Sequence, residues 1–482
     1  MKELMNTLVP AMLLVCGLTT VGSAQPAPIE QYEEPFDFFS GMFSGVGETE
    51  PFSVIDQLVV DGVPWMRLYF GETNLGANSY LVVNSDLEGT VQTIDAAALK
   101  SWSYATAAFN GDSLTIELVV APGDADIFYS VETAVVGDWG QGDSKSQQIK
   151  SICGTTDNRV ASNDNRGGRL RTVGCTAWLI QNDAVLTAGH CVDLDPDRSG
   201  PLLPDGVLDM TANWWVEFNV PASLANGTIV NSAPADQYPI ANVNSTQWRF
   251  DGEGQGLGKD WAVFALGDNG TTGTDPHIRF GFWRVSDANP AGSNTMRITG
   301  FGSDNLPPGS TGNRNAQNQT NQTHTGPYVE QVVSGADIWH RYQVDTTGGN
   351  SGSPIIWQTP SPDITVGIHT NAGCGGTDGS ISGANSGTSF EVNALETAIA
   401  TFPPGTGEEY VDTFNYPADG GITENGTIFH PWNSIAEGVA AAPDNGVLSV
   451  VEGTYVLTGQ VIIGADGRGL TLHAPVGTVT IR

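Results

Sequence analysis

The stretch TTGGNSGSP, residues 346–354, says more about the fold than any other part of the sequence. It places Ser351 among glycines and runs directly into the apolar residues 355–357, a pattern typical of a loop that enters a β-strand. Glycines near a serine let the backbone approach another group closely, but they are also common in ordinary loops. The stretch therefore raises the hypothesis of a reactive serine without establishing it.

Two further motifs precede this stretch. Residues 185–191 read VLTAGHC and contain His190, and residues 259–266 read KDWAVFAL, with Asp260 ahead of an apolar strand. Each motif alone has a structural explanation, such as a histidine in a turn or an exposed aspartate before a strand. The order His, Asp, Ser along one chain is hard to obtain by chance. It indicates nucleophilic chemistry, in which a histidine takes the proton of a serine hydroxyl.

The composition indicates a β-rich chain of several domains. A length of 482 residues is too great for one hydrophobic core, and 39% hydrophobic residues are enough to build several. The 60 glycines and many short Val, Ile and Thr runs favour strands joined by turns. With 19 Lys and Arg against 53 Asp and Glu, the net charge of −34 disfavours nucleic acid and anionic membranes as partners.

The N-terminus is typical of an exported protein. A charged start, an apolar stretch over residues 8–21 and small residues up to Ala24 predict a signal peptide over residues 1–24 and secretion. Pro10 and Gly17 interrupt the apolar stretch, which disfavours a membrane anchor, and no later segment is long and apolar enough to span a bilayer. Four cysteines follow the signal peptide: Cys153, Cys175, Cys191 and Cys374. An even number in an oxidising compartment predicts two disulfides, with three pairings open.

Shifts in composition divide the chain into segments, and strand patterns dominate, so the predicted fold class is all-β. We expect a mobile leader (25–51), a β-sandwich or jelly-roll domain (52–136), a polar linker (137–150), a domain with the three motifs (151–403) and a C-terminal unit (404–482). The C-terminal unit resembles the start of a right-handed parallel β-helix. Coils of a β-helix are stable only when stacked, and about two are present, so we expect this β-helix to be partial.

Together the three motifs resemble those of the chymotrypsin superfamily of serine proteases, across essentially all of residues 151–403. Within it, TTGGNSGSP and VGIHTNAG (366–373) are most similar to the bacterial glutamyl endopeptidases of the staphylococcal V8 type. The resemblance implies two β-barrels that meet along a cleft. His190 and Asp260 would come from the first barrel and Ser351 from the second.

The family's chemistry implies a role for each residue. Ser351 would attack a peptide carbonyl while His190 accepts its proton, and Asp260 would fix the tautomer of the imidazole. The backbone N–H groups of Gly349 and Ser351 would bind the oxyanion. The resemblance thus implies a secreted serine endopeptidase that acts on proteins or peptides through an acyl-enzyme and needs no metal or cofactor.

The resemblance also implies which cysteines pair in the two disulfides. Cys175 and Cys191 flank the strand and turn that deliver His190, and they match a bridge of the family. Cys153 and Cys374 are left to form the second disulfide. That bridge would hold the start of the protease domain beside the segment that contains His369.

The residues implied for the specificity pocket point in two directions. Asp345 lies six residues before Ser351, where trypsin-like enzymes carry the aspartate that selects Lys or Arg at P1. Thr346 and His369 instead match the positions that bind the substrate carboxylate in glutamyl endopeptidases. A hydroxyl and an imidazole can both donate to a carboxylate, which favours an acidic P1 residue, Glu. Lys or Arg specificity through Asp345 remains the alternative.

Asn350 implies an unusual activation. Trypsin-like zymogens have an aspartate at this position, which pairs with the ammonium of the newly formed N-terminus, and asparagine cannot make that ion pair. In the V8-type enzymes the mature N-terminus instead helps to bind the P1 carboxylate, and Ile152 lies near the matching position. We therefore expect a zymogen that is cleaved near Lys150–Ile152, which frees the sandwich as a pro-region.

Two alternatives concern other functions. The insertion between His190 and Asp260 contains five aspartates: Asp193, Asp195, Asp197, Asp205 and Asp209. Such residues can bind Ca²⁺, but Arg198 stands where a calcium loop has glycine, so we expect a solvated acidic loop and no metal. The rival function is a non-catalytic surface binding protein that uses the sandwich and the C-terminal unit for adhesion. The complete triad and the oxyanion glycine argue against it.

Overall fold

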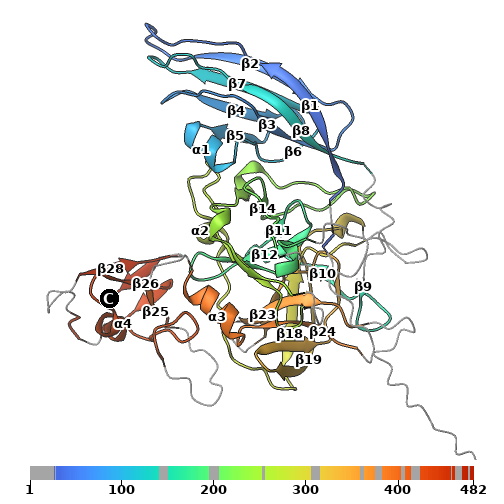
Figure 1. Ribbon diagram of the computed structural model, residues 1–482, viewed down its shortest axis with the longest axis vertical. Coiled ribbons are helices and arrows are strands. Elements are labelled where there is room, and N and C mark those ends of the chain that lie inside the picture. The colour runs from blue at the N-terminus through green and yellow to red at the C-terminus, as the bar shows by residue number, and fades with distance from the viewer. Residues whose placement is uncertain are drawn as a thin grey trace, which may run out of the picture.

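The computed structural model describes residues 26–27, 29–139, 150–194, 206–251, 256–304, 315–358, 363–374, 383–402, 408–413, 424–457, 459–461, 469–475 and 478–482. A β-sandwich lies at one end of the long axis, two barrel-like sheets lie next to it, and a smaller C-terminal unit lies beside the barrels (Figure 1). Strands far outnumber helices among the described residues, which confirms the all-β class. The predicted signal peptide falls outside the described residues, as does most of the predicted linker.

The first unit is a sandwich of two antiparallel sheets. One sheet has the order β1 (Gln31–Phe39), β8 (Ser130–Gly137), β3 (Trp65–Phe70), β6 (Phe109–Asn110), and the other the order β2 (Phe52–Val59), β7 (Ser113–Val120), β4 (Tyr80–Ser85), β5 (Val91–Ile94). In β7 the alternate residues Leu114, Ile116 and Leu118 are fully buried. This period of two directs one face of the strand to a core that the two sheets share. A short helix, α1 (Ala96–Ser101), follows β5.

The structure differs from the sequence analysis at the start of this unit. Residues 31–39, expected in a mobile leader, form β1 and pair with β8 from Gln31 opposite Gly137 to Phe39 opposite Ser130. The segment QYEEPFDFF did not suggest a strand because it contains three acidic residues and a proline. Because β1 is an edge strand with a register shift just after Pro35, it tolerates both charges and proline.

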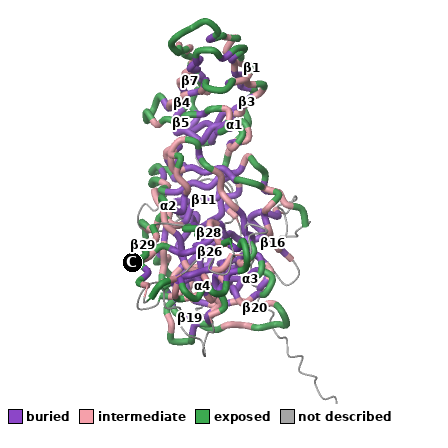
Figure 2. The backbone as a smooth tube through the Cα atoms, turned by 90° about the vertical axis from the view of Figure 1, so that its left-hand side faces the viewer, coloured by how far each residue is buried: buried purple, intermediate pink, exposed green. Residues whose placement is uncertain are grey.

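The sandwich is joined to the first barrel through a buried contact. The guanidinium of Arg67 in β3 is fully buried and lies 4.0 Å from the ring centre of Trp215. Trp215 belongs to strand β14 (Trp215–Glu217) of the barrel, yet it packs into the hydrophobic core of the sandwich. The Trp102 indole N–H also donates to the carbonyl of Asn269 at 3.0 Å. In Figure 2 the end of the sandwich that faces the barrels is accordingly more buried than its far end.

The first barrel is one antiparallel sheet. Its order is β15 (Gln237–Pro239), β14, β11 (Gly167–Leu170), β12 (Cys175–Leu179), β13 (Val185–Thr187), β17 (Trp261–Phe264), β16 (Gln247–Arg249). A β-bridge between Ile240 and Leu266 brings the β15 end of the sheet back to β17, which closes the barrel. Its strands are buried on both faces, because one face fills the barrel and the other meets neighbouring units.

The second barrel follows in the chain. Its order is β10 (Val160–Ala161), β19 (Gln322–Ser334), β18 (Thr295–Gly300), β22 (Pro354–Trp357), β23 (Ile364–Asn371), β24 (Asn385–Ser389), β20 (Asp337–Tyr342), and β19 also pairs with β20. That extra pairing closes the barrel. Two short helices, α2 (Pro276–Phe280) and α3 (Asn393–Ala400), pack outside the barrels. The predicted double β-barrel is therefore confirmed.

The C-terminal unit consists of parallel strands. β25 (Glu408–Val411), β26 (Gly446–Val450) and β28 (Leu470–His473) form one sheet, and β27 (Gly453–Tyr455) pairs with β29 (Val479–Ile481) in another. Helix α4 (Ile435–Ala441) packs on the first sheet. An ion pair of 2.7 Å between Arg284 and Asp412 attaches the unit to the barrels. Parallel pairing is what a β-helix coil requires, and the β-helix itself stays a prediction.

Candidate active site

His190 and Asp260 are delivered by two neighbouring strands of the first barrel. β13 ends just before His190 and β17 begins just after Asp260, and the two strands pair with Thr187 opposite Ala262. Gly189 lets the turn come close to the neighbouring backbone, because a Cβ there would lie 2.1 Å from the carbonyl oxygen of Arg249. The register of the sheet thus brings the imidazole and the carboxylate together.

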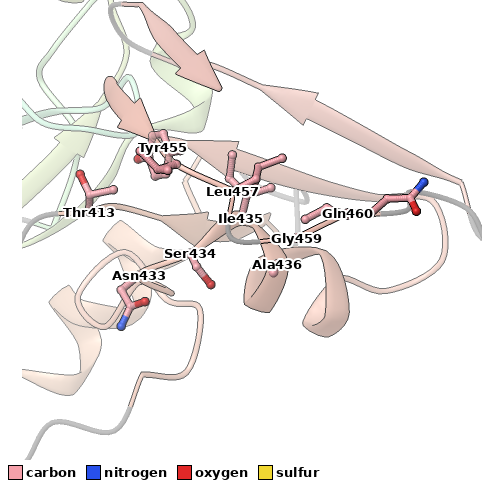
Figure 3. A pocket seen from close by; sticks show the side chains of 11 residues that line it. Thr413, Asn433, Ser434, Ile435, Ala436, Tyr455, Leu457, Gly459 and Gln460 are labelled. Carbon is pink, nitrogen blue, oxygen red and sulfur yellow. The ribbon is translucent and has the colours of Figure 1, made fainter. Parts of the chain in front are cut away.

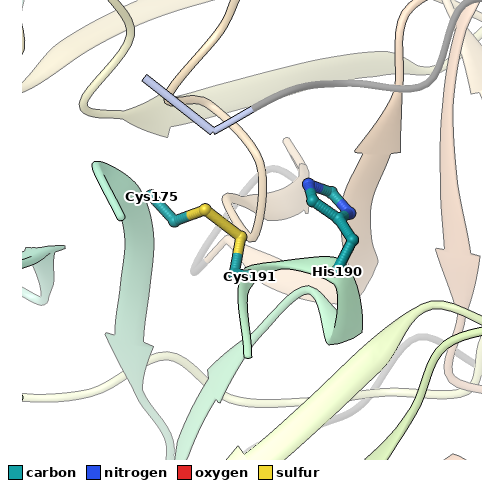
Figure 4. Close-up of side chains that lie close together, drawn as sticks. All are labelled: Cys175, His190 and Cys191. Atoms are coloured by element: carbon teal, nitrogen blue, oxygen red, sulfur yellow. A yellow bond between two sulfur atoms is a disulfide. The ribbon is translucent and has the colours of Figure 1, made fainter. Parts of the chain in front are cut away.

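Asp260 holds His190 by two hydrogen bonds. Its Oδ2 lies 2.6 Å from His190 Nδ1, and its Oδ1 accepts from the backbone N–H of His190 at 2.9 Å. Both side chains are 1% exposed. A carboxylate only accepts, so the proton of the neutral imidazole lies on Nδ1 and the lone pair on Nε2. Figure 4 shows this imidazole beside the Cys175–Cys191 disulfide.

Ser351 lies on the loop between β21 (Thr346–Thr347) and β22, which presses against the first barrel. Its carbonyl accepts from the backbone N–H of Thr176 at 2.9 Å, and that of Gly352 accepts from the indole N–H of Trp178 at 2.9 Å. Gly352 has φ of +87°, and a Cβ there would lie 2.2 Å from the oxygen of Thr176. Only glycine fits at this close approach of the two barrels.

The His–Ser hydrogen bond of a working triad is not formed. Among the described residues, neither His190 Nε2 nor Ser351 Oγ has a hydrogen-bond partner, although both side chains are buried. Catalytic hydrogen bonds are often long in the absence of substrate and tighten when it binds. The structure therefore brings His190 and Asp260 into contact, and it places Gly352, next to Ser351, close to Thr187 and Ala188, just ahead of His190.

The peptide between Gly348 and Gly349 has a fixed orientation. Its carbonyl accepts from the backbone N–H of Ser303 at 2.8 Å. In a trans peptide the N–H points opposite to the C=O, so the N–H of Gly349 faces away from Ser303. Within the described residues, the N–H groups of Gly349 and Ser351 donate to no other group. Both are thus available as donors to a developing oxyanion.

His369 in β23 is a buried imidazole with one nitrogen in use. Its Nδ1 lies 2.7 Å from the hydroxyl of Tyr342, and its Nε2 has no hydrogen-bond partner among the described residues. Burial, together with nearby His190 and against a smaller opposing effect of the Ser386 carbonyl, lowers the pKa of His369 to about 3. Burial also raises the pKa of Tyr342 well above its usual value, so its hydroxyl keeps its proton. A Tyr342 hydroxyl that donates to Nδ1 leaves the ring proton on Nε2.

Thr346 lies where the start of the protease domain pairs with β21, the strand that leads into residues 348–353, the nucleophile loop that carries Ser351. It pairs with Ser151 of β9 (Lys150–Ser151), and its Oγ1 accepts from Asn385 Nδ2 at 3.0 Å, which leaves its own proton to donate. The Ser151 hydroxyl in turn bonds to Asn385 and to Cys374. Cys153 is disulfide-bonded to Cys374, the pairing expected from the resemblance, so this crossing is covalently held.

Asp345 is buried, and groups of this chain already surround its carboxylate. Oδ1 accepts from the backbone N–H of Cys153 at 2.7 Å, and Oδ2 accepts from the backbone N–H of Asn158 at 2.8 Å and from its side-chain amide at 3.2 Å. His324 Nδ1 lies 3.5 Å from Oδ2, and the Asp345 side chain has no exposed surface. Its oxygens are therefore committed to anchoring the start of the domain.

A second cluster of titratable groups lies at the far side of the first barrel. Nδ1 of buried His277 lies 2.9 Å from Asp183 and 3.0 Å from Asp275, and its Nε2 lies 3.2 Å from the carbonyl of Ala184. Burial alone would lower the pKa of His277, but the two carboxylates raise it to about 9. The cluster is a self-sufficient ion triad. Of the five aspartates of the predicted acidic loop, Asp193 and Asp209 are described: Asp193 is 1% exposed and so is not solvated as expected, and Asp209 accepts from the backbone N–H of Leu194. The other three lie outside the described residues.

A cavity of about 290 Å³ in the C-terminal unit is lined partly by Ser434, Tyr455 and Leu457 (Figure 3). No member of the His190–Asp260–Ser351 set lines it, so it has no part in the chemistry described above. Among the described residues, no helix has the length and apolar character needed to cross a membrane.

The two closed barrels and the buried His–Asp pair beside a glycine-flanked serine define a chymotrypsin-like serine endopeptidase, which acts on peptide bonds. The family model described as Trypsin matches residues 154–386, and this part of the chain is a trypsin-family domain. Among solved structures, the chain is similar to one entitled "Structure of Glu endopeptidase in complex with MPD", with 19% identity and a TM-score of 0.36. The match covers 52% of this chain and 97% of that one. A comparison with curated proteins found no match.

Several residues of the site carry no recognisable sequence signal. Tyr342 and Asn385, which orient His369 and Thr346, lie outside the motifs. Arg159, which donates to Thr347 just before the loop of Ser351, stands in an ordinary polar segment. Only the pairing of distant strands brings these residues to the site.

Proposed function

We propose that this endopeptidase is secreted and cleaves after acidic residues, with a preference for Glu at P1. The observation that carries the proposal is the buried Nε2 of His369, which has no hydrogen-bond partner among the described residues and keeps the ring proton when the hydroxyl of Tyr342 donates to Nδ1. A neutral imidazole N–H is a good donor to a carboxylate. The hydroxyl of Thr346 also retains a proton to donate, and it is held by Asn385 of β24, the strand that pairs with the strand of His369.

In the proposed reaction, Ser351 Oγ attacks the carbonyl carbon while its proton passes to His190 Nε2. Asp260 keeps the imidazole oriented and stabilises the imidazolium that forms. The N–H groups of Gly349 and Ser351 bind the oxyanion, and the protonated His190 gives its proton to the leaving amine. Water then attacks the acyl-enzyme by the same route in reverse, which restores the serine and releases the acid.

The contacts of Asp345 argue against Lys or Arg at P1. A trypsin-like pocket needs a carboxylate that is open to the substrate cation, whereas backbone and side-chain N–H groups occupy both oxygens of Asp345. A buried carboxylate with satisfied oxygens gains little from a further cation and would have to give up existing hydrogen bonds.

Activation by cleavage near Lys150–Ile152 is part of the proposal. Lys150 and Ser151 form β9 and pair with Thr347 and Thr346. A cut in this strand would create an α-ammonium next to Thr346, where it adds a positive charge beside the proposed carboxylate site. N-terminal sequencing of the active form tests the position of the cut. Full activity of an uncut chain would exclude this route.

The decisive experiment is a scan of peptide substrates that differ only at P1 (Glu, Gln, Lys, Arg), made on the wild type and on His369→Gln. We expect Glu to be the best P1 residue and the variant to lose preference for Glu over Gln by at least ~10-fold. His340→Gln is a matched control, since His340 is also buried and bonded to a tyrosine, but its Nε2 already has a partner in the carbonyl of Val366.

Two results would contradict the proposal. Fastest cleavage after Lys or Arg would show that Asp345, and not His369, recognises the P1 side chain. Failure of a fluorophosphonate probe to label Ser351, judged against Ser351→Ala in correctly processed protein, would favour the non-catalytic binding protein instead.

A further inference from the structure

A buried arginine lies beneath the nucleophile loop. Arg159 is 4% exposed and belongs to the segment that follows the Cys153–Cys374 disulfide. Its guanidinium makes two hydrogen bonds to Asp157, from Nε at 3.0 Å and from Nη2 at 2.7 Å. These bonds fix the plane of the guanidinium and direct its remaining N–H groups toward the loop.

Arg159 contacts Thr347 and Ser303, the two residues that lie next to the oxyanion peptide, that is, the peptide between Gly348 and Gly349. Nη1 donates to Thr347 Oγ1 at 2.8 Å, and Nη2 donates to the carbonyl of Ser303 at 3.1 Å. The N–H of Ser303 holds the carbonyl of Gly348, and so orients the N–H of Gly349. The hydroxyl of Thr347 also donates to the Ser303 carbonyl, so Thr347 and Ser303 are bonded both to each other and to the guanidinium of Arg159.

Asn350 extends this network without adding charge. Its Oδ1 accepts from the N–H of Thr347 at 3.0 Å, and its own N–H donates to the carbonyl of Thr347 at 3.0 Å. A Cβ on Gly302 would lie 2.2 Å from Asn350 Oδ1 and 2.5 Å from Arg159 Nη1, so the backbone is packed tightly against both. The position where a trypsin-like zymogen gains an ammonium is thus already next to a cation of the chain itself.

We propose that Arg159 is a positioning residue that holds the oxyanion peptide of Gly348 and Gly349 in place. The loop then reaches its working geometry without an ion pair from a new N-terminus. This inference rests on the proposed role of Gly349 as an oxyanion donor.

The test is Arg159→Lys, which keeps the positive charge but cannot make the two parallel hydrogen bonds of the guanidinium to Asp157. We expect kcat on the best P1 substrate to fall ~10–100-fold with KM within about twofold, because loss of one oxyanion donor costs ~100–1000-fold and a misplaced one costs less. The affinity of a peptide boronate, whose tetrahedral adduct places an oxygen against the same N–H groups, should fall by the same factor. Asp157→Asn, which loosens Arg159 without removing it, should give a smaller fall in both.

Arg166→Lys is the matched control, because Arg166 forms the same fork with Asp164 but stacks on Trp283, away from the loop. It should leave kcat and boronate affinity unchanged. A folded Arg159→Lys variant with wild-type kcat, or one whose kcat falls without a loss of boronate affinity, would overturn the inference. An inactive wild type would refute the proposed function itself.

A different observation carries a second inference. Ala27 is fully buried, its N–H donates to the carbonyl of Gly174 at 3.0 Å, and its carbonyl accepts from Gln319 Nε2 at 2.9 Å. Its methyl lies 3.3 Å from where a Cβ on Gly349 would be. The segment, blue as in Figure 1, is visible beside the disulfide in Figure 4. Two residues later, Ile29 is buried in the core of the sandwich.

This segment takes a strand partner and space that an extended substrate needs. A reacting carbonyl must lie about 3 Å from the N–H groups of Gly349 and Ser351, and Ala27 packs against Gly349. Ala27 also uses the backbone carbonyl of Gly174, next to Cys175, as an added strand would. We infer that residues 26–27, next to Ile29 in the core of the sandwich, act as an intramolecular competitor for substrates that extend beyond the scissile bond.

Ala27→Trp tests this, because the indole has no room against Gly349 and should displace the segment. We expect kcat/KM to rise on the order of 10-fold for peptides that extend several residues past the scissile bond. For anilides, which end at that bond, it should stay within about twofold. Ala125→Trp on an exposed loop of the sandwich is the control. An unchanged kcat/KM on the long peptides would overturn this inference, and an equal rise on both kinds of substrate would show that the segment does not act as a competitor.

Discussion

Asp260→Asn is the sharpest test of the triad geometry, because the structure specifies what one atom does. In the wild type, Oδ1 accepts from the backbone N–H of His190 and Oδ2 faces Nδ1 at 2.6 Å. An asparagine can keep its oxygen on the backbone N–H, which places its NH₂ group against Nδ1. A donor there requires Nδ1 to be the acceptor, so the ring proton moves to Nε2.

The cost follows from that change of tautomer. Nε2 would then face Ser351 with a proton and could no longer accept one, although the shape of the site is preserved. Loss of the correct tautomer in such a triad lowers kcat by about 10,000-fold, which corresponds to ~5 kcal/mol of transition-state stabilisation. KM should change little, because Asp260 is 1% exposed and has no surface that faces a substrate.

The assay is steady-state hydrolysis of the best P1 peptide, with the melting temperature measured in parallel. Asp412→Asn is a suitable control, since Asp412 is also 1% exposed and pairs with an arginine at the edge of the barrels. It should lower stability and leave kcat unchanged. An Asp260→Asn variant that is folded and keeps more than about one-tenth of the wild-type kcat would refute the reasoning.

Two other predictions concern stability and assembly. Burial would lower the pKa of His277, but the carboxylates of Asp183 and Asp275 raise it to about 9. Its contribution to stability, at most ~3 kcal/mol, is therefore complete below an unfolded pKa of ~6.5 and is lost as the pH rises through 9. Between these pH values the free energy of urea unfolding should fall less in His277→Gln than in the wild type, and an equal fall in both would contradict this. The sequence predicts that a cut near Lys150–Ile152 frees the sandwich, but the buried stacking of Arg67 on Trp215 should keep the cut sandwich bound to the barrels. The two parts should then elute together in gel filtration, and Arg67→Ala should separate them; a free sandwich from the cut wild type would contradict this.

The residues that could be predicted are those whose neighbours in sequence are also their structural support. His190 follows its own strand and carries its own disulfide, and Ser351 is surrounded by the glycines that its close contact with Thr176 requires. Such local motifs predict the residues of the site even when the fold is not known. Strand β1 lacks a local signal, because its acidic residues and proline are tolerated only at the edge of a sheet that forms much later in the chain.

Asp345 shows why spacing alone cannot assign a specificity pocket. Its distance along the chain from Ser351 equals that of the aspartate in trypsin-like enzymes, yet its oxygens accept from Cys153 and Asn158, residues about 190 positions earlier. Whether a carboxylate recognises a cation depends on whether its lone pairs are free, and that is a property of the folded chain. The same criterion selects His369, whose Nε2 is buried and unpartnered among the described residues. Our proposal of an acidic P1 residue therefore rests on the unsatisfied donor rather than on the conspicuous carboxylate.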